Sequence, residues 1–231
     1  IWESELEAKL QELMEKCKNP TIAPYAGTGE VKLRVTASLP EGEDAETLLQ
    51  PAIKKILAAA GDYCYGIDVP DLQTAVVQSL RQKGLTVASA ESCTGGLVAA
   101  RLTEVPGASA VFGCGIVSYN NTVKAEVLGV DPAIIEQHTA VSAETAAAMA
   151  EAVRKKSGAD IGIGVTGNAG PSASEGQPVG LVFVAVASEK YSHVSRLFID
   201  RHDADARNLI RHFAALKALS LILRAAGYYK E

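Results

Sequence analysis

Apolar and polar residues follow two different periods in the first part of the chain. Residues 2–17, Trp2 included, carry apolar side chains at the three- and four-residue spacing of one helical face, which predicts an amphipathic helix that ends before Asn19-Pro20. Residues 30–39 alternate apolar and polar side chains, as a half-buried strand does. A second helix is expected over residues 45–60, and a short strand over 63–67. These elements predict a small α+β domain spanning residues 1–68.

From residue 69 onward, strand-like and helix-like patterns alternate along the chain. The expected helices begin near Pro70, directly after Gly96, and at about residues 121, 143 and 203. The expected strands cover residues 85–90, 111–119, 160–166, 179–188 and 191–200. Only Glu189 and Lys190 separate the last two strands, so we expect those two to pair antiparallel. Residues 69–231 are therefore predicted to form an α/β domain, a three-layer α/β/α sandwich with a mixed sheet.

Composition agrees with a folded protein of one or two domains. The 231 residues are 48% hydrophobic and 21% charged. No apolar stretch reaches the roughly 20 residues of a membrane span, so none is expected. The chain begins with Ile1 and a Glu-rich amphipathic segment unlike a secretion signal, and we interpret it as a piece of a longer protein.

Cysteine spacing and charge exclude several classes of site. The four cysteines show no metal-ligand spacing, which favours a reducing, cytoplasmic location and predicts no metal and no disulfide framework. Residues 1–70 hold 12 acidic and 7 basic residues, a net charge of −5, and residues 71–231 hold 15 of each. Neither part has the basic excess that binding to nucleic acid requires, so no nucleic-acid partner is expected.

The strongest chemical pattern is the segment Glu91-Ser92-Cys93-Thr94-Gly95-Gly96 between a predicted strand and a predicted helix. Such a turn exposes one side chain at the edge of the sheet and leaves unpaired N–H groups at the start of the helix. The pattern fits a nucleophile beside an anion or oxyanion pocket. A tight turn with Ser92 as a helix cap would give the same local pattern, and the segment is not the G-x-S-x-G elbow of hydrolases.

A second candidate group comprises Tyr119 and Lys124, at the end of the next strand. Lys124 can act as a base only if burial or a neighbouring charge lowers its pKa, and Tyr119 could relay a proton. An exposed lysine on a short helix is the ordinary alternative. A Tyr-x-x-x-Lys dehydrogenase is excluded, because the spacing is one residue too long and no G-x-G-x-x-G motif follows the first strand of the α/β domain.

Two further segments could contact a ligand. Thr166 and Gly167 follow a buried strand and begin a Gly- and Pro-rich loop, which could present backbone donors or be a simple turn. Arg201 ends the last strand and could hold a phosphate or a carboxylate. The four histidines lie in no motif with a nucleophile, which leaves a lysine as the better base for Ser92.

Taken together, these motifs resemble the CinA C-terminal domain, a family also known as the nicotinamide mononucleotide amidases of the PncC type. Residues 19–38 and 61–66 resemble the KH-like middle domain of full-length CinA proteins. Those proteins carry a further N-terminal domain, which we expect to lie outside the given sequence. The motifs that carry the C-terminal resemblance occur in order and are AESCTGG (90–96), SYNNTVKAEVLGV (118–130), AVS (140–142), TGNAGP (166–171), QPVG (177–180) and Asp200-Arg201.

The resemblance implies hydrolysis of the carboxamide of nicotinamide mononucleotide to nicotinic acid mononucleotide and ammonia, without a cofactor. It makes Ser92 the nucleophile and maps the remaining catalytic residues to Tyr119 and Lys124. We expect Arg201, with Thr94 and the helix start, to hold the phosphate of this substrate. The oxyanion donors are expected near Thr166 and Gly167 or at Gly95 and Gly96, and the sequence leaves both choices open.

The sequence departs from the family pattern at three places. Asn168 replaces an apolar residue, residues 172–175 replace a glycine-rich stretch, and Ile199 replaces the glycine before Asp200-Arg201, all of which bears on substrate preference. A non-catalytic, partner-binding role related to competence or DNA damage is the alternative of another class, and Cys93 is the alternative nucleophile. The KH-like part lacks a G-x-x-G loop, so we expect it to serve a structural role or to form a homodimer.

Overall fold

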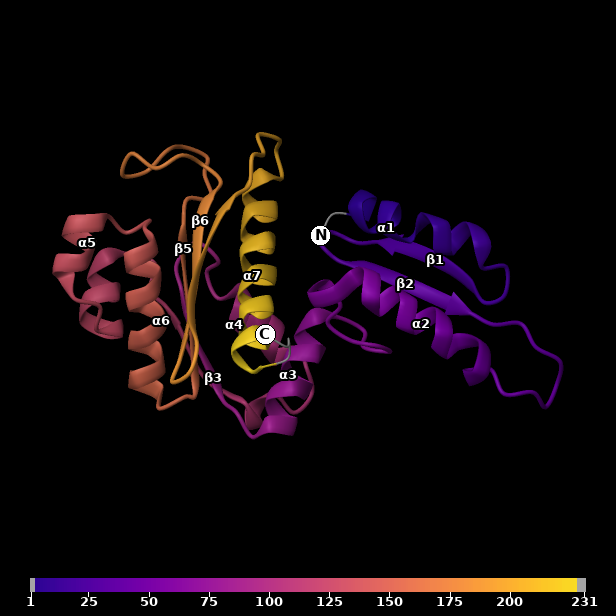
Figure 1. Ribbon diagram of the computed structural model, residues 1–231. Coiled ribbons are helices and arrows are strands. Elements are labelled where there is room, and N and C mark those ends of the chain that lie inside the picture. The colour runs from indigo at the N-terminus through magenta and orange to yellow at the C-terminus, as the bar shows by residue number, and fades with distance from the viewer. Residues whose placement is uncertain (1–2, 228–231) are drawn as a thin grey trace. The chain divides into compact units, whose positions relative to one another are not determined.

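The computed structural model describes residues 3–227 and divides into two compact units, Ile1–Ile67 and Asp68–Glu231 (Figure 1). Each unit has its own buried residues, and each is described here by itself. Trp2, placed by the sequence pattern in the first helix, lies outside the described residues.

The first unit is a two-stranded antiparallel sheet with two helices. Its elements are α1 (Glu3–Lys16), β1 (Thr21–Ala26), β2 (Val31–Thr36), α2 (Glu46–Ala60) and a short 3₁₀ turn (Gly61–Tyr63). A small cluster of buried side chains joins them, formed by Leu6, Leu10, Ile22, Ile56 and Ala60. The α+β character predicted for this part is confirmed.

Two details of this unit differ from the prediction. Strand β1 was not expected, because Pro24 interrupts a segment without clear alternation; each strand of a two-stranded sheet is an edge, where proline is tolerated. The short strand expected over residues 63–67 is absent, since the chain there leaves the 3₁₀ turn in an irregular path.

The second unit is built on a five-stranded mixed sheet with the order β4-β3-β5-β6-β7. Strand β3 pairs parallel with both β4 and β5, whereas β5–β6 and β6–β7 are antiparallel. The predicted mixed sheet and its closing hairpin are therefore confirmed. The strands are β3 (Val87–Glu91), β4 (Phe112–Val117), β5 (Ile161–Gly167), β6 (Leu181–Ser188) and β7 (Ser192–Phe198).

Helices cover both faces of this sheet, which confirms the three-layer arrangement (Figure 1). One face carries α5 (Pro132–His138), which the sequence did not predict, and α6 (Ala143–Ser157). The opposite face carries α3 (Leu72–Lys83), α4 (Leu97–Thr103) and α7 (Ala206–Ala225). None of the helices in the described part of the chain is long and apolar enough to cross a membrane.

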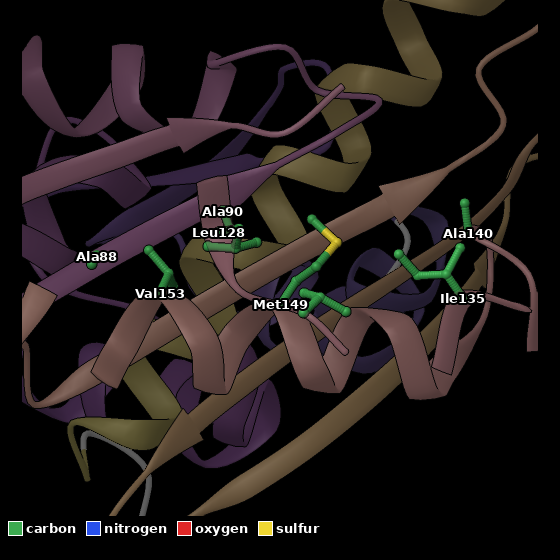
Figure 2. Close-up of a cluster of buried hydrophobic side chains, with 8 residues drawn as sticks. Ala88, Ala90, Leu128, Ile135, Ala140, Met149 and Val153 are labelled. Carbon is green, nitrogen blue, oxygen red and sulfur yellow. The ribbon is translucent and has the colours of Figure 1, made fainter. Parts of the chain in front are cut away.

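A buried cluster ties the middle of the sheet to the helices that surround the candidate site (Figure 2). Leu128, from the turn after β4, packs with Ala90 of β3, which lies two residues before Ser92. Met149 and Val153 of α6 complete the contact. This packing holds the segment that carries Lys124 against the strand that carries Ser92.

Glycines allow α6 to lie directly on β5. A Cβ at Gly162 would approach the Ala150 carbonyl oxygen to 2.1 Å, and one at Gly164 would approach the Ala146 carbonyl oxygen to 2.3 Å. Both distances are far below van der Waals contact, so only glycine fits at these two positions. The close approach of α6 helps to fix the carboxyl end of β5. There Thr166 and Gly167 begin the Gly- and Pro-rich loop that was predicted to contact a ligand, and this loop is called the ligand loop below.

Candidate active site

Ser92 directly follows β3, the middle strand of the parallel part of the sheet. Its N–H donates to the Val165 carbonyl oxygen at 2.9 Å, which continues the pairing of β3 with β5 past the last strand residue. The Ser118 N–H donates to the Glu91 carbonyl oxygen at 2.8 Å and fixes the other side. Ser92 is 8% exposed and opens onto a pocket. Its position is thus set by backbone bonds to both neighbouring strands.

Lys124 lies in a short π-helical turn, Val123–Leu128, instead of the ordinary helix expected over residues 121–128. The Asn120 side-chain oxygen accepts the Val123 N–H at 2.8 Å and starts the turn, and Gly129, with φ of +90°, ends it. Such π-helical turns are rare and concentrate at functional sites. Here the turn carries Lys124 into the interior, where its side chain is only 1% exposed.

The buried ammonium nitrogen meets the predicted nucleophile. Lys124 Nζ lies 3.4 Å from Ser92 Oγ and 3.4 Å from the Tyr119 carbonyl oxygen. Burial lowers the pKa of Lys124 from its ordinary value of 10.5, and the Glu175 carboxylate partly opposes this change. In the described part of the chain no carboxylate forms an ion pair with Lys124, so no ion pair offsets the effect of burial on its pKa.

Ser92 and Lys124 line a pocket of about 300 Å³, the lower end of the size range of small-molecule sites. The sequence-predicted residues Tyr119, Thr166 and Gly167 line it as well. The ligand loop closes its other side. The remaining lining residues are Cys93, Asn121, Ala140, Val141, Asn168, Ala169, Gly170, Ser172, Ser174, Glu175 and Arg207.

Tyr119 lies at the rim of this pocket and not between Lys124 and Ser92. Its side chain is 59% exposed, and its hydroxyl accepts a hydrogen bond from Arg207 at 3.0 Å. Lys124 contacts the backbone carbonyl of Tyr119 and reaches Ser92 directly. The geometry therefore favours direct proton transfer over the relay through the phenol.

Arg207 is the pocket arginine that the sequence motif missed. Arg201, expected to hold the phosphate, lies in the exposed connection after β7, where its guanidinium faces Asp203 at 3.7 Å, and it does not line the pocket. Arg207 is on the first turn of α7 and also donates to the Gly170 carbonyl oxygen. The signal for it is weak in the sequence, because Arg207 is one of three arginines near the start of a long helix, with Arg211 one turn further on.

The start of α4 does not bind a ligand as predicted, with Thr94 and the first amides of the helix holding a phosphate. Thr94, Gly95 and Gly96 do not line the pocket. The buried Glu91 carboxylate accepts the N–H groups of Val98 at 3.0 Å and Ala99 at 2.9 Å, and so occupies the amides at the helix start. The Gly95 N–H is also engaged, since it donates to the Ser92 carbonyl oxygen at 3.0 Å. A carboxylate of the protein itself thus takes the place predicted for the substrate phosphate.

Cys93 is a poor nucleophile in this setting. Its side chain is 5% exposed, and burial raises the pKa of the thiol to about 12. A thiol with so high a pKa holds almost no thiolate at neutral pH, and the thiolate is the reactive form. The structure therefore favours Ser92 over the alternative at position 93.

The ligand loop is fastened to the opposite wall of the pocket. The Thr166 hydroxyl donates to the Ala140 carbonyl oxygen at 2.6 Å, and the Ala140 N–H donates to Glu175 Oε2 at 2.8 Å. Asn168, the departure from the family pattern, uses its side-chain amide to hold the loop, with donors 3.0 Å from the Ser172 carbonyl and 3.1 Å from the Gln177 carbonyl. Asn168 is hence a loop-stabilising residue as well as a pocket residue.

Residues 3–227 bring together no group of three or more His, Cys, Asp or Glu side chains that could hold a metal ion.

Comparison with known families gives two matches that together span nearly the whole chain. Residues 70–226 match the model described as the CinA C-terminal domain. Residues 1–66 match the model described as the damage-inducible protein CinA KH domain. The resemblance seen in the motifs is thus confirmed for both parts.

Curated relatives extend over both parts and are longer than this chain. A CinA-like protein from Dictyoglomus turgidum is 41% identical over 97% of this chain and 54% of its own length. A putative competence-damage inducible protein from Lysinibacillus sphaericus is 44% identical, over 100% of this chain and 55% of its own length. The chain spans about half the length of the curated relatives it matches.

Solved structures resemble the larger part of the chain. Competence/damage inducible protein CihA from Agrobacterium tumefaciens is 34% identical with a TM-score of 0.63, and the match covers 70% of this chain and 98% of that one. A CinA superfamily protein from Klebsiella pneumoniae is 28% identical with a TM-score of 0.64, over 68% of this chain and 97% of that one. These proteins are nearly fully covered by about seven-tenths of the present chain.

Proposed function

The chain belongs to the CinA family, with a KH domain and a C-terminal domain, and from that premise we propose that it hydrolyses the carboxamide of nicotinamide mononucleotide. The products are nicotinic acid mononucleotide and ammonia, formed through an acyl-enzyme on Ser92. The observation that carries the proposal is the buried Lys124 amine 3.4 Å from the Ser92 hydroxyl, in a pocket of small-molecule size.

The first step is proton transfer from Ser92 to Lys124. A lysine must be neutral to accept a proton, and burial, which lowers the pKa of Lys124, favours this form. Ser92 Oγ then attacks the carboxamide carbon and forms a tetrahedral intermediate. The Lys124 ammonium afterwards returns the proton to the amide nitrogen, the C–N bond breaks, and ammonia leaves. A water molecule deprotonated by Lys124 hydrolyses the ester and regenerates Ser92.

Backbone amides at the pocket stabilise the oxyanion. The Gly95 and Asn168 N–H groups are already bonded, to the carbonyl oxygens of Ser92 and Leu181. We assign this role to the N–H groups of Cys93 and Ala169, two residues that line the pocket. In α/β-hydrolases the amide directly after the nucleophilic serine is one of the oxyanion donors, and we propose the same role here for the amide of Cys93. One such donor is typically worth about 3–4 kcal/mol of the barrier.

Arg207 takes the substrate phosphate in this proposal, in place of Arg201. It is the one arginine among the pocket-lining residues that the structure describes, and a guanidinium binds a phosphate by two parallel hydrogen bonds. In the structure its N–H groups are held by the Gly170 carbonyl and the Tyr119 hydroxyl. Tyr119 consequently acts as a positioning residue for Arg207.

The proposal is tested by following ammonia and nicotinic acid mononucleotide released from nicotinamide mononucleotide by the purified chain. We expect equimolar products and a loss of at least about a thousandfold in kcat for Ser92→Ala, as for the removal of other catalytic serines. Turnover that survives in Ser92→Ala would contradict the acyl-enzyme. Absence of turnover in the unaltered chain would favour the non-catalytic, partner-binding alternative.

A further inference from the structure

The pocket has one negatively charged wall whose purpose the hydrolysis mechanism leaves open. Glu175 is the one carboxylate among the pocket-lining residues that the structure describes. It neither gives nor takes a proton in the proposed transfers between Ser92 and Lys124. The other fixed charge of the lining is Arg207, so the pocket presents a carboxylate and a guanidinium as separate charges.

The Glu175 carboxylate is held in place by the protein. Oε2 accepts the Ala140 N–H at 2.8 Å, and Oε1 lies 3.4 Å from the Asn121 side-chain nitrogen. Its backbone has φ of +52°, a left-handed conformation that a residue other than glycine rarely adopts. Glu175 lines the same pocket as Lys124, and its negative charge partly opposes the lowering of the Lys124 pKa that burial causes. Glu175 is thus an exposed carboxylate that hydrogen bonds tether to the wall of the pocket that Lys124 also lines.

The proposed substrate carries two opposite charges of its own. In nicotinamide mononucleotide the ring nitrogen bonded to ribose is a pyridinium cation, and the other end is a phosphate. The ring is directly attached to the carboxamide, so when that group lies at Ser92 the cation lies close to the walls beside Lys124. The 1,4-dihydro form has the same shape and the same phosphate but a neutral ring.

We propose that Glu175 is the counter-ion of the pyridinium ring and makes the site selective for oxidised nicotinamide nucleotides over their neutral-ring forms. The proposal rests on the proposed function, because it takes the same substrate in the same pocket. Arg207 attracts the phosphate of both forms equally. Glu175 distinguishes them, since a carboxylate attracts a cationic ring and has no charge interaction with a neutral one.

Glu175→Gln separates this role from a purely structural one. Glutamine keeps the length of the side chain and an oxygen that can accept the Ala140 N–H, but it removes the charge. Glu136→Gln is the matched control. Glu136 lines the adjoining cavity of about 380 Å³, which also includes Asn121 and Glu175, but it does not line the catalytic pocket.

The experiment measures binding of nicotinamide mononucleotide and of its 1,4-dihydro form to the Ser92→Ala protein by calorimetry, so that no reaction intervenes. We expect Glu175→Gln to weaken binding of the oxidised nucleotide about tenfold, or about 1.4 kcal/mol, and to change binding of the dihydro form less than twofold. Glu136→Gln is expected to change neither. In the protein with Ser92 intact, Glu175→Gln should raise KM for the oxidised nucleotide by a similar factor.

Two results would overturn the inference. Equal weakening of both forms by Glu175→Gln would make Glu175 a structural tether of the loop, and unchanged binding of the oxidised form would remove it from recognition altogether. Either result leaves the amidase proposal standing as long as the unaltered chain releases ammonia. Failure of the proposed function is recognised separately, by the absence of ammonia release from the unaltered chain.

Discussion

At the scale of single residues, the site depends on one costly feature, a lysine placed almost wholly inside the protein. A buried ammonium loses its hydration, so the neutral amine is favoured and the pKa falls. Only the neutral amine can take the Ser92 proton. In the proposed mechanism, the burial that would destabilise an ordinary lysine is what allows Lys124 to act as the base.

This burial predicts the pH dependence of the reaction. Activity should rise with pH as Lys124 loses its proton, and the rise should lie below the ordinary lysine pKa of 10.5. Glu175 favours the protonated form, so Glu175→Gln should lower the pKa of Lys124 further and move the rise to lower pH. The measurement is kcat against pH for both proteins. A rise that stays in place or moves to higher pH in Glu175→Gln would contradict the electrostatic assignment.

The same burial predicts how stability responds to replacing Lys124. Between the lowered folded-state pKa and 10.5 the unfolded chain binds more protons, so the free energy of unfolding rises with pH. Lys124→Met keeps most of the volume and removes this cost. We expect its melting temperature at pH 7 to equal or exceed that of the unaltered chain. A fall of more than about 4 °C, roughly 1–2 kcal/mol for a chain of this size, would show that the amine stabilises the fold.

Cys93 gives a third residue-scale prediction. With a thiol pKa of about 12 and a buried side chain, Cys93 should not react with iodoacetamide in the native protein at pH 7.5. Cys93→Ala should retain activity within about threefold, because only the backbone amide of residue 93 is used. The measurement is ammonia release before and after treatment with the reagent. Loss of activity in Cys93→Ala with the fold intact would reinstate the thiol as nucleophile.

The residues of the site were predictable to different degrees. Ser92 and Lys124 stand in dense motifs, and the structure brings their side chains together. Arg207 was missed because the sequence match to the family motif Asp200-Arg201 pointed to Arg201. In the structure, the connection between β7 and α7 instead places Arg207 at the pocket. Glu91 was missed as a helix cap because it lies seven and eight residues before Val98 and Ala99, whose N–H groups it accepts, with a glycine-containing turn between them.

At the scale of elements, strand β5 and helix α6 form the closest contact that positions the site. The sequence predicted both bounds of the strand and the start of the helix within one residue, since buried strands and capped helices leave clear patterns. An ordinary helix was predicted where the π-helical turn lies, and α5 was not predicted at all. A single wide turn has no periodicity of its own, and a seven-residue helix is too short to show one.

The β5–α6 contact predicts opposite results for two glycines. Gly164→Ala should destabilise the protein by about 3 kcal/mol or more, because its Cβ would collide with the Ala146 carbonyl oxygen and the α6 backbone. Gly113→Ala on strand β4 should cost little, since a Cβ there meets nothing within 4 Å. Urea unfolding of both variants measures the difference. Similar stabilities would mean that α6 does not lie so close to the sheet.

At the scale of the whole molecule, the residues proposed to be catalytic all belong to one unit. Every residue of the pocket lies within residues 68–231. Related solved structures are covered to 97–98% of their length by about seven-tenths of this chain, which is about the size of this unit. The division into two units follows a change in composition near residue 68 that is visible in the sequence, because each part must bury its own core.

This organisation predicts that residues 68–231 fold and react without the first unit. We expect the separate fragment to keep kcat for nicotinamide mononucleotide within about threefold of the full chain. Circular dichroism checks the fold and ammonia release checks the reaction. A folded but inactive fragment would show that the KH domain contributes to catalysis.

The most direct test concerns the amine at position 124 and the hydroxyl at position 92 as one catalytic unit. Ammonia release from nicotinamide mononucleotide is measured for the unaltered chain, Ser92→Ala, Lys124→Met and the double variant, each checked for folding by circular dichroism. Groups that act as a unit are strongly non-additive, so we expect each single change to lower kcat at least about a thousandfold and the double change to add less than about tenfold. A folded Lys124→Met protein that retains more than a tenth of the original rate would contradict the mechanism.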